Sequence, residues 1–170
     1  MVVVGGPGSG KSSVAAQLAR VLGVAPIELD GLWWGPDWKP AGREQLRDDV
    51  RDVLAIDSWI VDGNYVDDVA DLVWRRADVV VWLDLPRRVA VRRAVRRSVR
   101  RILAAEALWN GNHESLAVLS PRSITTLVRR WPSYSERIAS ALVDLEIPVE
   151  RVVRLRSDAE KERWLEHLSA

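Results

Sequence analysis

Short apolar runs alternate along this chain with stretches in which apolar residues recur every three or four positions. The runs predict five buried strands, at Met1–Val4, Pro26–Asp30, Trp59–Val61, Asp78–Leu85 and Arg151–Leu155. The stretches between them predict helices, because residues such as Val14 and Leu18 then share one face. Strands that are each followed by a helix indicate an α/β protein of three layers, α/β/α, with a five-stranded parallel sheet and helices on both faces.

Helix-capping and turn residues place the remaining elements. We expect helices near Leu46–Leu54, Val66–Arg75, Arg87–Leu108 and Pro121–Asp144, with a break or kink at Pro132, and a last helix from Ser157. The segment Gly31–Pro40 is expected to be a loop. No internal repeat or linker interrupts the pattern, so the 170 residues predict a single domain, 1–170.

The loop between the first strand and the first helix is rich in glycine and runs GGPGSGKS from Gly5 to Ser12. It matches G-x-x-x-x-G-K-S, and a strand before it with a helix after it is the context that identifies a phosphate-binding P-loop. In such a loop, Lys11 reaches the β- and γ-phosphates of ATP and the Ser12 hydroxyl binds Mg²⁺. We expect the phosphates to contact Gly5, Gly6, Gly8, Ser9, Gly10, Lys11, Ser12 and Ser13.

A carboxylate stands at or just beyond the end of each of the next three predicted strands: Asp30, Asp62 and Asp84. Ligands bind at the carboxyl ends of parallel strands, where the P-loop also lies. Asp84 ends the clearest buried strand, so we expect it to hold Mg²⁺ together with Ser12. We expect Asp30 to orient or deprotonate the acceptor hydroxyl or to hold the metal, and Asp62 is a second candidate on the substrate side. Each of the three also fits an ordinary turn or helix cap.

Eight arginines lie in the predicted helix 87–108 with no acidic residue between them: Arg87, Arg88, Arg92, Arg93, Arg96, Arg97, Arg100 and Arg101. Val91, Val95, Val99 and Leu103 form a stripe at a spacing of four, so the arginines occupy the other faces. Three interpretations stay open. The arginines clamp the transferring phosphoryl group, they bind nucleic acid, or they form a solvated face that acids elsewhere neutralise.

Tryptophan is unusually frequent, with nine residues against no phenylalanine. Trp33, Trp34 and Trp38 share one predicted loop and fit a substrate pocket that stacks an aromatic or sugar group. Packing of a mobile loop explains the cluster equally well. The two histidines, His113 and His167, are isolated and are expected to be structural or exposed.

The net charge of +1 gives no general attraction to nucleic acid or membranes, and the absence of cysteine excludes disulfides and thiolate metal sites. We find no signal peptide at the start and no apolar stretch of the roughly 20 residues that a membrane span needs. We therefore expect a cytoplasmic protein with no membrane partner.

The chain resembles the adenylate-kinase-like P-loop kinases, and most closely the small branch of "DNA topology modulation" or adenylate-kinase-related proteins. The resemblance rests on GGPGSGKS (5–12), ELDGLWW (28–34), WIVDGNY (59–65), WLDLPRR (82–88) and RLRS (154–157). It implies a P-loop NTPase fold with an Arg-rich helical lid, inserted at about residues 87–131. It also implies a metal role for Asp84, lid arginines at Arg88, Arg92 and Arg96, a further phosphate-binding Arg129, and an adenine site at Arg156 and Ser157.

The chain departs from this family on the acceptor side. Nucleoside monophosphate kinases carry an arginine shortly after the third strand, and here the stretch from Asp62 to Val66 has none. The segment between Asp30 and Asp62 is also short for a monophosphate-binding domain. Both departures argue against a nucleotide acceptor.

The sequence therefore predicts ATP- and Mg²⁺-dependent phosphoryl transfer to a small-molecule acceptor, a nucleoside, a nucleotide or a similar compound. In this hypothesis Lys11, Asp30, Arg92, Arg96 and Arg129 act in catalysis, and Trp33, Trp34, Asp30 and Asp62 bind the acceptor. The alternative, which the net charge supports less, is a nucleotide-binding regulatory or nucleic-acid-associated P-loop protein without kinase activity.

Overall fold

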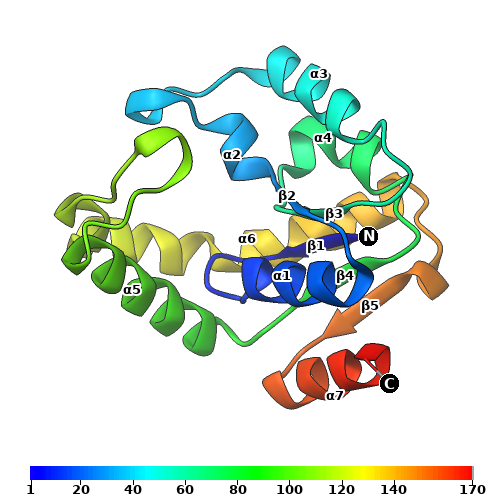
Figure 1. Ribbon diagram of the computed structural model, residues 1–170. Helices are drawn as coiled ribbons and strands as arrows, with labels where there is room; N and C mark the ends of the chain where they lie inside the picture. The colour runs from blue at the N-terminus through cyan, green and yellow to red at the C-terminus, as the bar shows by residue number, and fades with distance from the viewer. Residues whose placement is uncertain (170) are drawn as a thin grey trace.

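The five strands form one parallel sheet in the computed structural model, which describes residues 1–169. They are β1 (Val2–Gly5), β2 (Pro26–Glu28), β3 (Ile60–Asp62), β4 (Val80–Leu83) and β5 (Val152–Leu155). Their order across the sheet is β2-β3-β1-β4-β5, so the strand that leads into the P-loop lies in the middle (Figure 1). The predicted five-stranded parallel α/β architecture is confirmed.

The longer helices are α1 (Lys11–Leu22), α2 (Leu29–Trp33), α3 (Arg43–Val53), α4 (Val66–Val73), α5 (Arg87–Leu103), α6 (Pro121–Asp144) and α7 (Asp158–Ser169). Short 3₁₀ turns complete the fold: η1 (Pro36–Trp38), η2 (Trp109–Gly111), η3 (Leu116–Leu119) and η4 (Val149–Arg151). The helices α1 and α7 lie on one side of the sheet, and α3, α4 and α6 lie on the other (Figure 1).

Three predicted elements differ from the structure. Residues 29–33 form α2 instead of continuing β2 into a loop, and α5 ends at Leu103, two residues before Ala105 takes a positive φ of 45°. The helix α6 runs through Pro132 without ending there. Trp131 before the proline and Ile138 after it are both buried, so tertiary packing holds the two halves in line.

Two apolar layers stabilise the sheet. On one face, Val3 and Val81 pack against Leu18 and other residues of α1, with Trp164 of α7 at the edge. On the other face the core is larger, and fully buried Trp74 lies at the end of α4 within it. The strands β1 and β4 are continuous apolar runs whose residues are all buried, as expected for strands that are covered on both faces.

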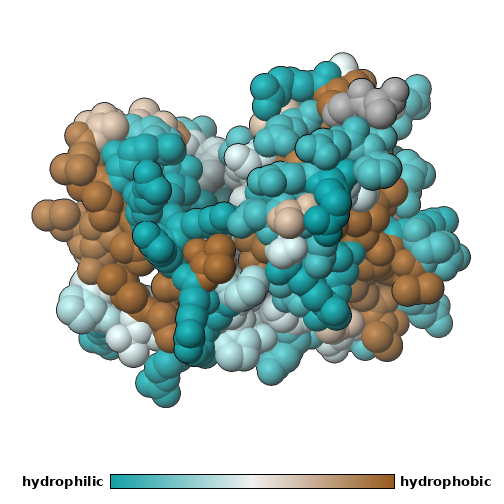
Figure 2. Space-filling model, turned by 90° about the horizontal axis from the view of Figure 1, so that it is seen from below, coloured by the Kyte–Doolittle hydropathy of each residue, from teal (hydrophilic) through white to brown (hydrophobic). Residues whose placement is uncertain are grey.

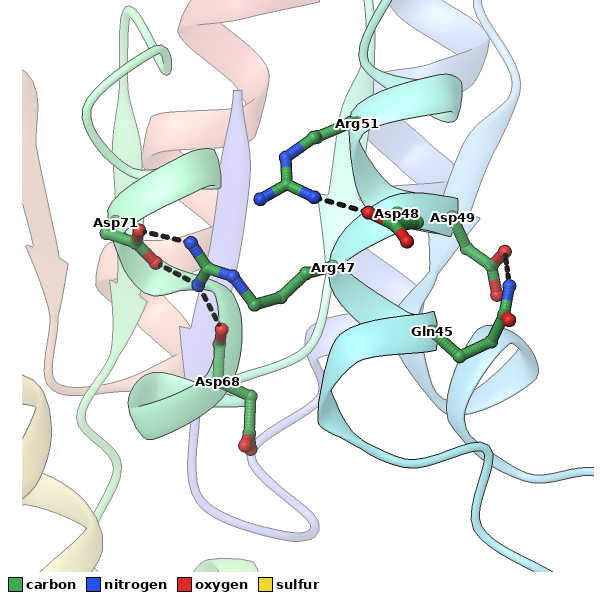
Figure 3. Close-up of polar contacts among 7 residues, drawn as sticks. All are labelled: Gln45, Arg47, Asp48, Asp49, Arg51, Asp68 and Asp71. Carbon is green, nitrogen blue, oxygen red and sulfur yellow. Dashed lines mark hydrogen bonds and ion pairs between the residues drawn. The ribbon is translucent and has the colours of Figure 1, made fainter.

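A polar network joins α3 to α4 (Figure 3). Arg47 donates two hydrogen bonds to the Asp71 carboxylate, both of 2.8 Å, and a third of 2.6 Å to the backbone carbonyl of Asp68. The guanidinium lowers the pKa of Asp71 below its usual range, chiefly through this hydrogen bonding. Gln45 and Arg51 bond only within α3, to Asp49 and Asp48. Arg47 is therefore the side chain of this group that fixes one helix against the other.

Figure 2 views the molecule from below and shows hydrophobic residues gathered at the end where α5 and the following turns lie. The exposed apolar side chains of this region are Val99, Leu103, Leu116 and Val118. Within residues 1–169, no helix combines the length and the hydrophobicity needed to cross a membrane.

Candidate phosphate and acceptor cleft

Two neighbouring helices pack directly on the P-loop, which connects β1 to α1. Gly8 has a φ of +78°, and a Cβ atom there would lie 2.1 Å from the Ala90 carbonyl oxygen of α5. A Cβ atom on Gly6 would lie 2.5 Å from the Trp131 ring of α6. Glycine is required at both positions because backbone and ring approach too closely for a side chain. The loop is thereby fixed between the sheet, α5 and α6.

Lys11 is the first residue of α1, and its ammonium group bonds to the loop itself. Its Nζ donates to the carbonyl oxygens of Gly5 (2.9 Å) and Gly6 (3.3 Å). Burial lowers the pKa of Lys11 from its usual value, and the nearby carboxylates of Asp62 and Asp30 offset part of this effect. The charged lysine thus stands over the loop, where phosphate oxygens would replace weaker carbonyl partners.

Asn64 binds Gly5, the first residue of the P-loop, through both the backbone N–H and the backbone C=O of that glycine. Its Oδ1 accepts a hydrogen bond from Gly5 N (2.8 Å), and its Nδ2 donates to Gly5 O (2.7 Å). Asn64 follows β3, so this contact joins two neighbouring strands beyond the end of their ladder. Sequence reasoning gave this asparagine no role of its own, because no local pattern shows a partner 59 positions away.

Replacing Asn64 with Ala is expected to lower the free energy of unfolding by about 1–3 kcal/mol, because the buried N–H of Gly5 loses its partner. The loosened loop should also bind ATP more weakly. Urea unfolding and calorimetric titration with ATP measure the two effects. As a control, Asn110→Ala removes an exposed amide that bonds the Trp34 carbonyl, and it should leave ATP binding unchanged. Equal stability of Asn64→Ala and the parent chain would contradict a structural role for the contact.

Asp62 is the carboxylate that the fold brings to Lys11 and Ser12. It is 7% exposed and ends β3, whose register pairs it with Val3 of the P-loop strand. Burial raises the pKa of Asp62 above its usual range, although Lys11 and the Ser12 hydroxyl lower it again in part. Its Oδ1 has no hydrogen-bond partner within the described residues. An unsatisfied buried carboxylate oxygen beside a P-loop serine fits a magnesium ligand.

The structure does not bring Asp84 to this cleft. The carboxylate accepts hydrogen bonds from Arg154 (3.0 and 2.5 Å) and from the Ser135 hydroxyl (2.7 Å). The Arg154 guanidinium also lies 4.0 Å from the centroid of the Trp82 ring. Asp84 therefore ties β4 to β5 and α6, and it does not line the hollow that contains Lys11 and Ser12. Both β3 and β4 flank β1, and sequence alone favoured the more hydrophobic of the two.

Asp30 lies where two hollows meet, and its predicted role toward the acceptor stays a prediction. Its Oδ1 accepts a hydrogen bond of 2.7 Å from the Tyr65 hydroxyl. Asp30 lines the central hollow, which we define as the one that Lys11, Ser12 and Asp62 also line, and the larger cavity beside it. Burial, together with the Asp30 charge, raises the pKa of Tyr65, so the phenol stays protonated and remains a donor. Tyr65 takes a left-handed conformation with φ 32°, which places it at the turn before α4.

The arginines of α5 meet the P-loop with a different face from the one we expected. The hollow over the loop, of about 340 Å³, is lined by Gly8, Gly10, Lys11, Ser12, Ser13, Arg93, Arg97, Arg100 and Arg101. Arg88, Arg92 and Arg96 are exposed and do not line it, and neither do Arg129 or Arg156. The phase of the helix explains the difference. Its buried residues are Ala90 and Ala94, which pack on Gly8, whereas Val99 and Leu103 of the expected apolar stripe are exposed.

Tryptophans line a second cavity, of about 590 Å³, beside the central hollow. Its lining comprises Asp30, Trp34, Trp38, Arg97, Ser98, Arg101, Trp109, His113, Glu114, Ser115 and Val118. Trp33 does not line it and instead lies against Tyr65, with ring centroids 5.7 Å apart. The segment 109–118 was missed as part of this site, because only the fold places it across from residues 30–38.

Asn112 docks that segment on the tryptophan loop. It is buried, accepts a hydrogen bond from Trp38 N (2.9 Å) and donates to the Gly35 carbonyl (2.9 Å). Trp109 adds a bond of 2.7 Å from its indole N–H to Glu28. The cavity is therefore closed on one side by residues that follow α5, and Figure 1 shows this segment beside α2.

A comparison with solved structures finds similar folds. Shikimate kinase from Bacteroides thetaiotaomicron matches with a TM-score of 0.60 and 18% sequence identity, over 99% of this chain and 92% of that chain. A gluconokinase from Sinorhizobium meliloti 1021 matches at 0.49 and 20% identity, over 98% and 93% of the two chains. Deoxyadenosine kinase from M. mycoides with bound dATP matches at 0.48 and 14%, over 99% and 98%.

No protein-family model and no curated protein sequence matches the chain, so the narrower resemblance to the DNA topology modulation branch stays a prediction. All three of the similar structures are kinases, and the closest in shape of these three, with a TM-score of 0.60, is 18% identical. At that identity the similarity establishes the P-loop α/β fold of this chain.

Proposed function

We propose that this chain is an ATP- and Mg²⁺-dependent kinase that phosphorylates a hydroxyl group of a small molecule. One observation carries the proposal. The hollow over the P-loop, the central hollow and the tryptophan-lined cavity share Arg97 and Arg101, so a single cleft runs from phosphate-binding groups to a separate ligand cavity. A protein that only bound a nucleotide would not need a second cavity joined to the γ-phosphate end.

On the donor side, the P-loop amides and Lys11 hold the triphosphate. Arg97 and Arg100 line the same hollow from α5, where guanidinium groups can bind phosphate oxygens in pairs. Ser12 and Asp62 are the residues that would hold Mg²⁺, which when bound neutralises charge on the β- and γ-phosphates. That small set of protein ligands suits an ion that takes most of its ligands from water and phosphate.

On the acceptor side, Asp30 orients the hydroxyl and receives its proton. The acceptor oxygen forms a bond to the γ-phosphorus while the bond from that phosphorus to the β,γ-bridging oxygen breaks, and ADP leaves. Tyr65 keeps the Asp30 carboxylate in place through its 2.7 Å hydrogen bond. Catalysis then consists mainly of positioning and of stabilising the charge on the transferring group.

The segment of about 87–131 acts as the lid in this proposal. It contributes α5 with its inward arginines, and then Trp109 and Glu114 of the acceptor cavity. One continuous segment thus contacts both substrates and excludes water from between them. We expect the enzyme to work in the cytoplasm, where ATP and Mg²⁺ are available.

The proposal is tested by incubating the protein with ATP, Mg²⁺ and a panel of nucleosides, nucleotides, sugars and hydroxy acids. We expect ADP release that depends on one class of acceptor, with the new phosphate ester identified by ³¹P NMR. ATP binding without a phosphorylated product from any acceptor would argue against a kinase.

A second candidate function follows from the exposed arginines of α5. Arg88, Arg92 and Arg96 lie outside the cleft and face solvent, an arrangement that fits a nucleic-acid surface. It predicts binding to DNA or RNA that weakens steeply with salt. The absence of such binding at low ionic strength would exclude this function, which the low net charge already disfavours.

A further inference from the structure

The charged side chains of the acceptor cavity point to a choice of substrate. We propose that the acceptor is an uncharged ring compound with hydroxyl groups, not one that already carries a phosphate or carboxylate, and that Glu114 enforces this choice. The inference rests on the proposed kinase function and concerns only its acceptor side.

Arg101, one of the two arginines in the cavity wall, is already neutralised by the protein. Its guanidinium pairs with Glu114 at 3.0 Å and with Glu106 at 3.4 Å. The side chains of Arg101 and Glu114 are only 15% and 11% exposed, so water screens this pair weakly. An anionic acceptor would have to compete with two carboxylates for Arg101. Arg101 also lies 5.8 Å from the centre of the Trp109 ring, which holds it in the wall.

Arg97 is the other arginine of the cavity, and in the proposed reaction it binds the phosphates of ATP. It lines the hollow over the P-loop as well as the acceptor cavity. Asp30 and Glu114 oppose Arg97 and Arg101 in the cavity wall, so these four charges sum to zero before ATP binds. Once the triphosphate engages Arg97, the acceptor meets two carboxylates and an arginine that is already paired. A phosphate or carboxylate on the acceptor would be repelled there.

The remaining lining suits an uncharged ring. Trp34 and Trp38 meet edge to face with centroids 5.7 Å apart, and Trp38 meets Trp109 in the same way at 6.4 Å. Such indoles offer flat apolar surfaces to a nucleobase or to the face of a sugar. Glu114 Oε2 is buried without a hydrogen-bond partner within the described residues, so an O–H or N–H group of a bound ring that reached it would satisfy it.

The test compares matched pairs of acceptors that differ in charge: a nucleoside with its 5′-monophosphate, and a sugar with its sugar acid and sugar phosphate. Comparing the nucleoside pair with the sugar set shows whether the ring that binds is a nucleobase or a sugar. In either the nucleoside pair or the sugar set, we expect kcat/KM for the uncharged compound to exceed that of its charged partners by at least about 100-fold. Glu114→Gln should narrow this ratio by about 10-fold or more, mainly through KM, because Arg101 becomes available to an anion.

Two further variants separate selectivity from folding. Glu106→Gln removes the more distant partner of Arg101 at a position outside the cavity lining, so it should narrow the ratio less than Glu114→Gln does. Glu114→Asp keeps the charge and should keep the selectivity, even if Glu114→Gln folds poorly. Preference for a charged acceptor, or an unchanged ratio in Glu114→Gln, overturns the inference. If the parent chain binds ATP but binds every uncharged compound only weakly, as measured by tryptophan fluorescence, the inference is also overturned. If the parent chain does not bind ATP, the result argues against the kinase proposal itself.

Discussion

Lys11→Ala is expected to reduce phosphoryl transfer by on the order of 10²- to 10³-fold, with little effect on folding. Lys11 is the only basic residue of the P-loop sequence Gly5–Ser12, and its Nζ donates hydrogen bonds to the carbonyl oxygens of Gly5 and Gly6. Charge on the γ-phosphate oxygens grows or shifts as the bond to ADP breaks, and a fixed ammonium stabilises that state. Removing it leaves the site without its central cation.

The variant should still fold, because burial lowers the pKa of Lys11, which indicates that a charged ammonium group in this position costs stability. We expect an equal or slightly higher midpoint of thermal unfolding for Lys11→Ala, measured by circular dichroism, together with weaker ATP binding. Lys39→Ala is the matched control, since the Lys39 side chain is 79% exposed and pairs only with Asp37 at 3.8 Å. Phosphoryl transfer by Lys11→Ala at the rate of Lys39→Ala would contradict the role proposed for Lys11.

The sheet and the P-loop could be predicted because their signals are local. Continuous valine runs, the spacing from Gly5 to Ser12 and the periodic apolar face of α1 each lie within a few residues of one another. The contacts that decide which carboxylate meets the loop are not local. Both β3 and β4 lie beside β1, yet the Asp62 carboxylate interacts with the charge of Lys11, whereas the Asp84 carboxylate pairs with Arg154.

The helix α5 shows the same limit, because local spacing did not predict which of its faces is buried. Valines at a spacing of four suggested the buried face of α5, but glycine in the P-loop admits the small residues Ala90 and Ala94 instead. This rotation moves Arg97 and Arg101 into the cleft in place of Arg92 and Arg96. Likewise, no local pattern joins Asn112 to Trp38, 74 positions away, so half of the acceptor cavity could not be predicted.

Asp62→Asn is expected to remove most of the Mg²⁺-dependent activity, by on the order of 10²-fold or more, whereas Asp84→Asn should retain it. The two substitutions are chemically identical, and they distinguish the site seen in the structure from the one expected from sequence. Asparagine at position 62 keeps the shape of the side chain and removes its charge. Because Asp62 is nearly fully buried with an unsatisfied oxygen, losing the charge should also leave the fold as stable or more stable.

The pair is read through two measurements, kcat/KM as a function of Mg²⁺ concentration and the midpoint of thermal unfolding. For Asp62→Asn we expect a large rise in the Mg²⁺ concentration that gives half-maximal rate, at unchanged or higher stability. For Asp84→Asn we expect the reverse, a normal Mg²⁺ response with lower stability, because Arg154 and Ser135 lose a shared acceptor. A normal Mg²⁺ response in Asp62→Asn together with its loss in Asp84→Asn would indicate that Asp84, at the end of β4, is the Mg²⁺ ligand. It would also mean that the contact with Arg154 breaks when the nucleotide binds.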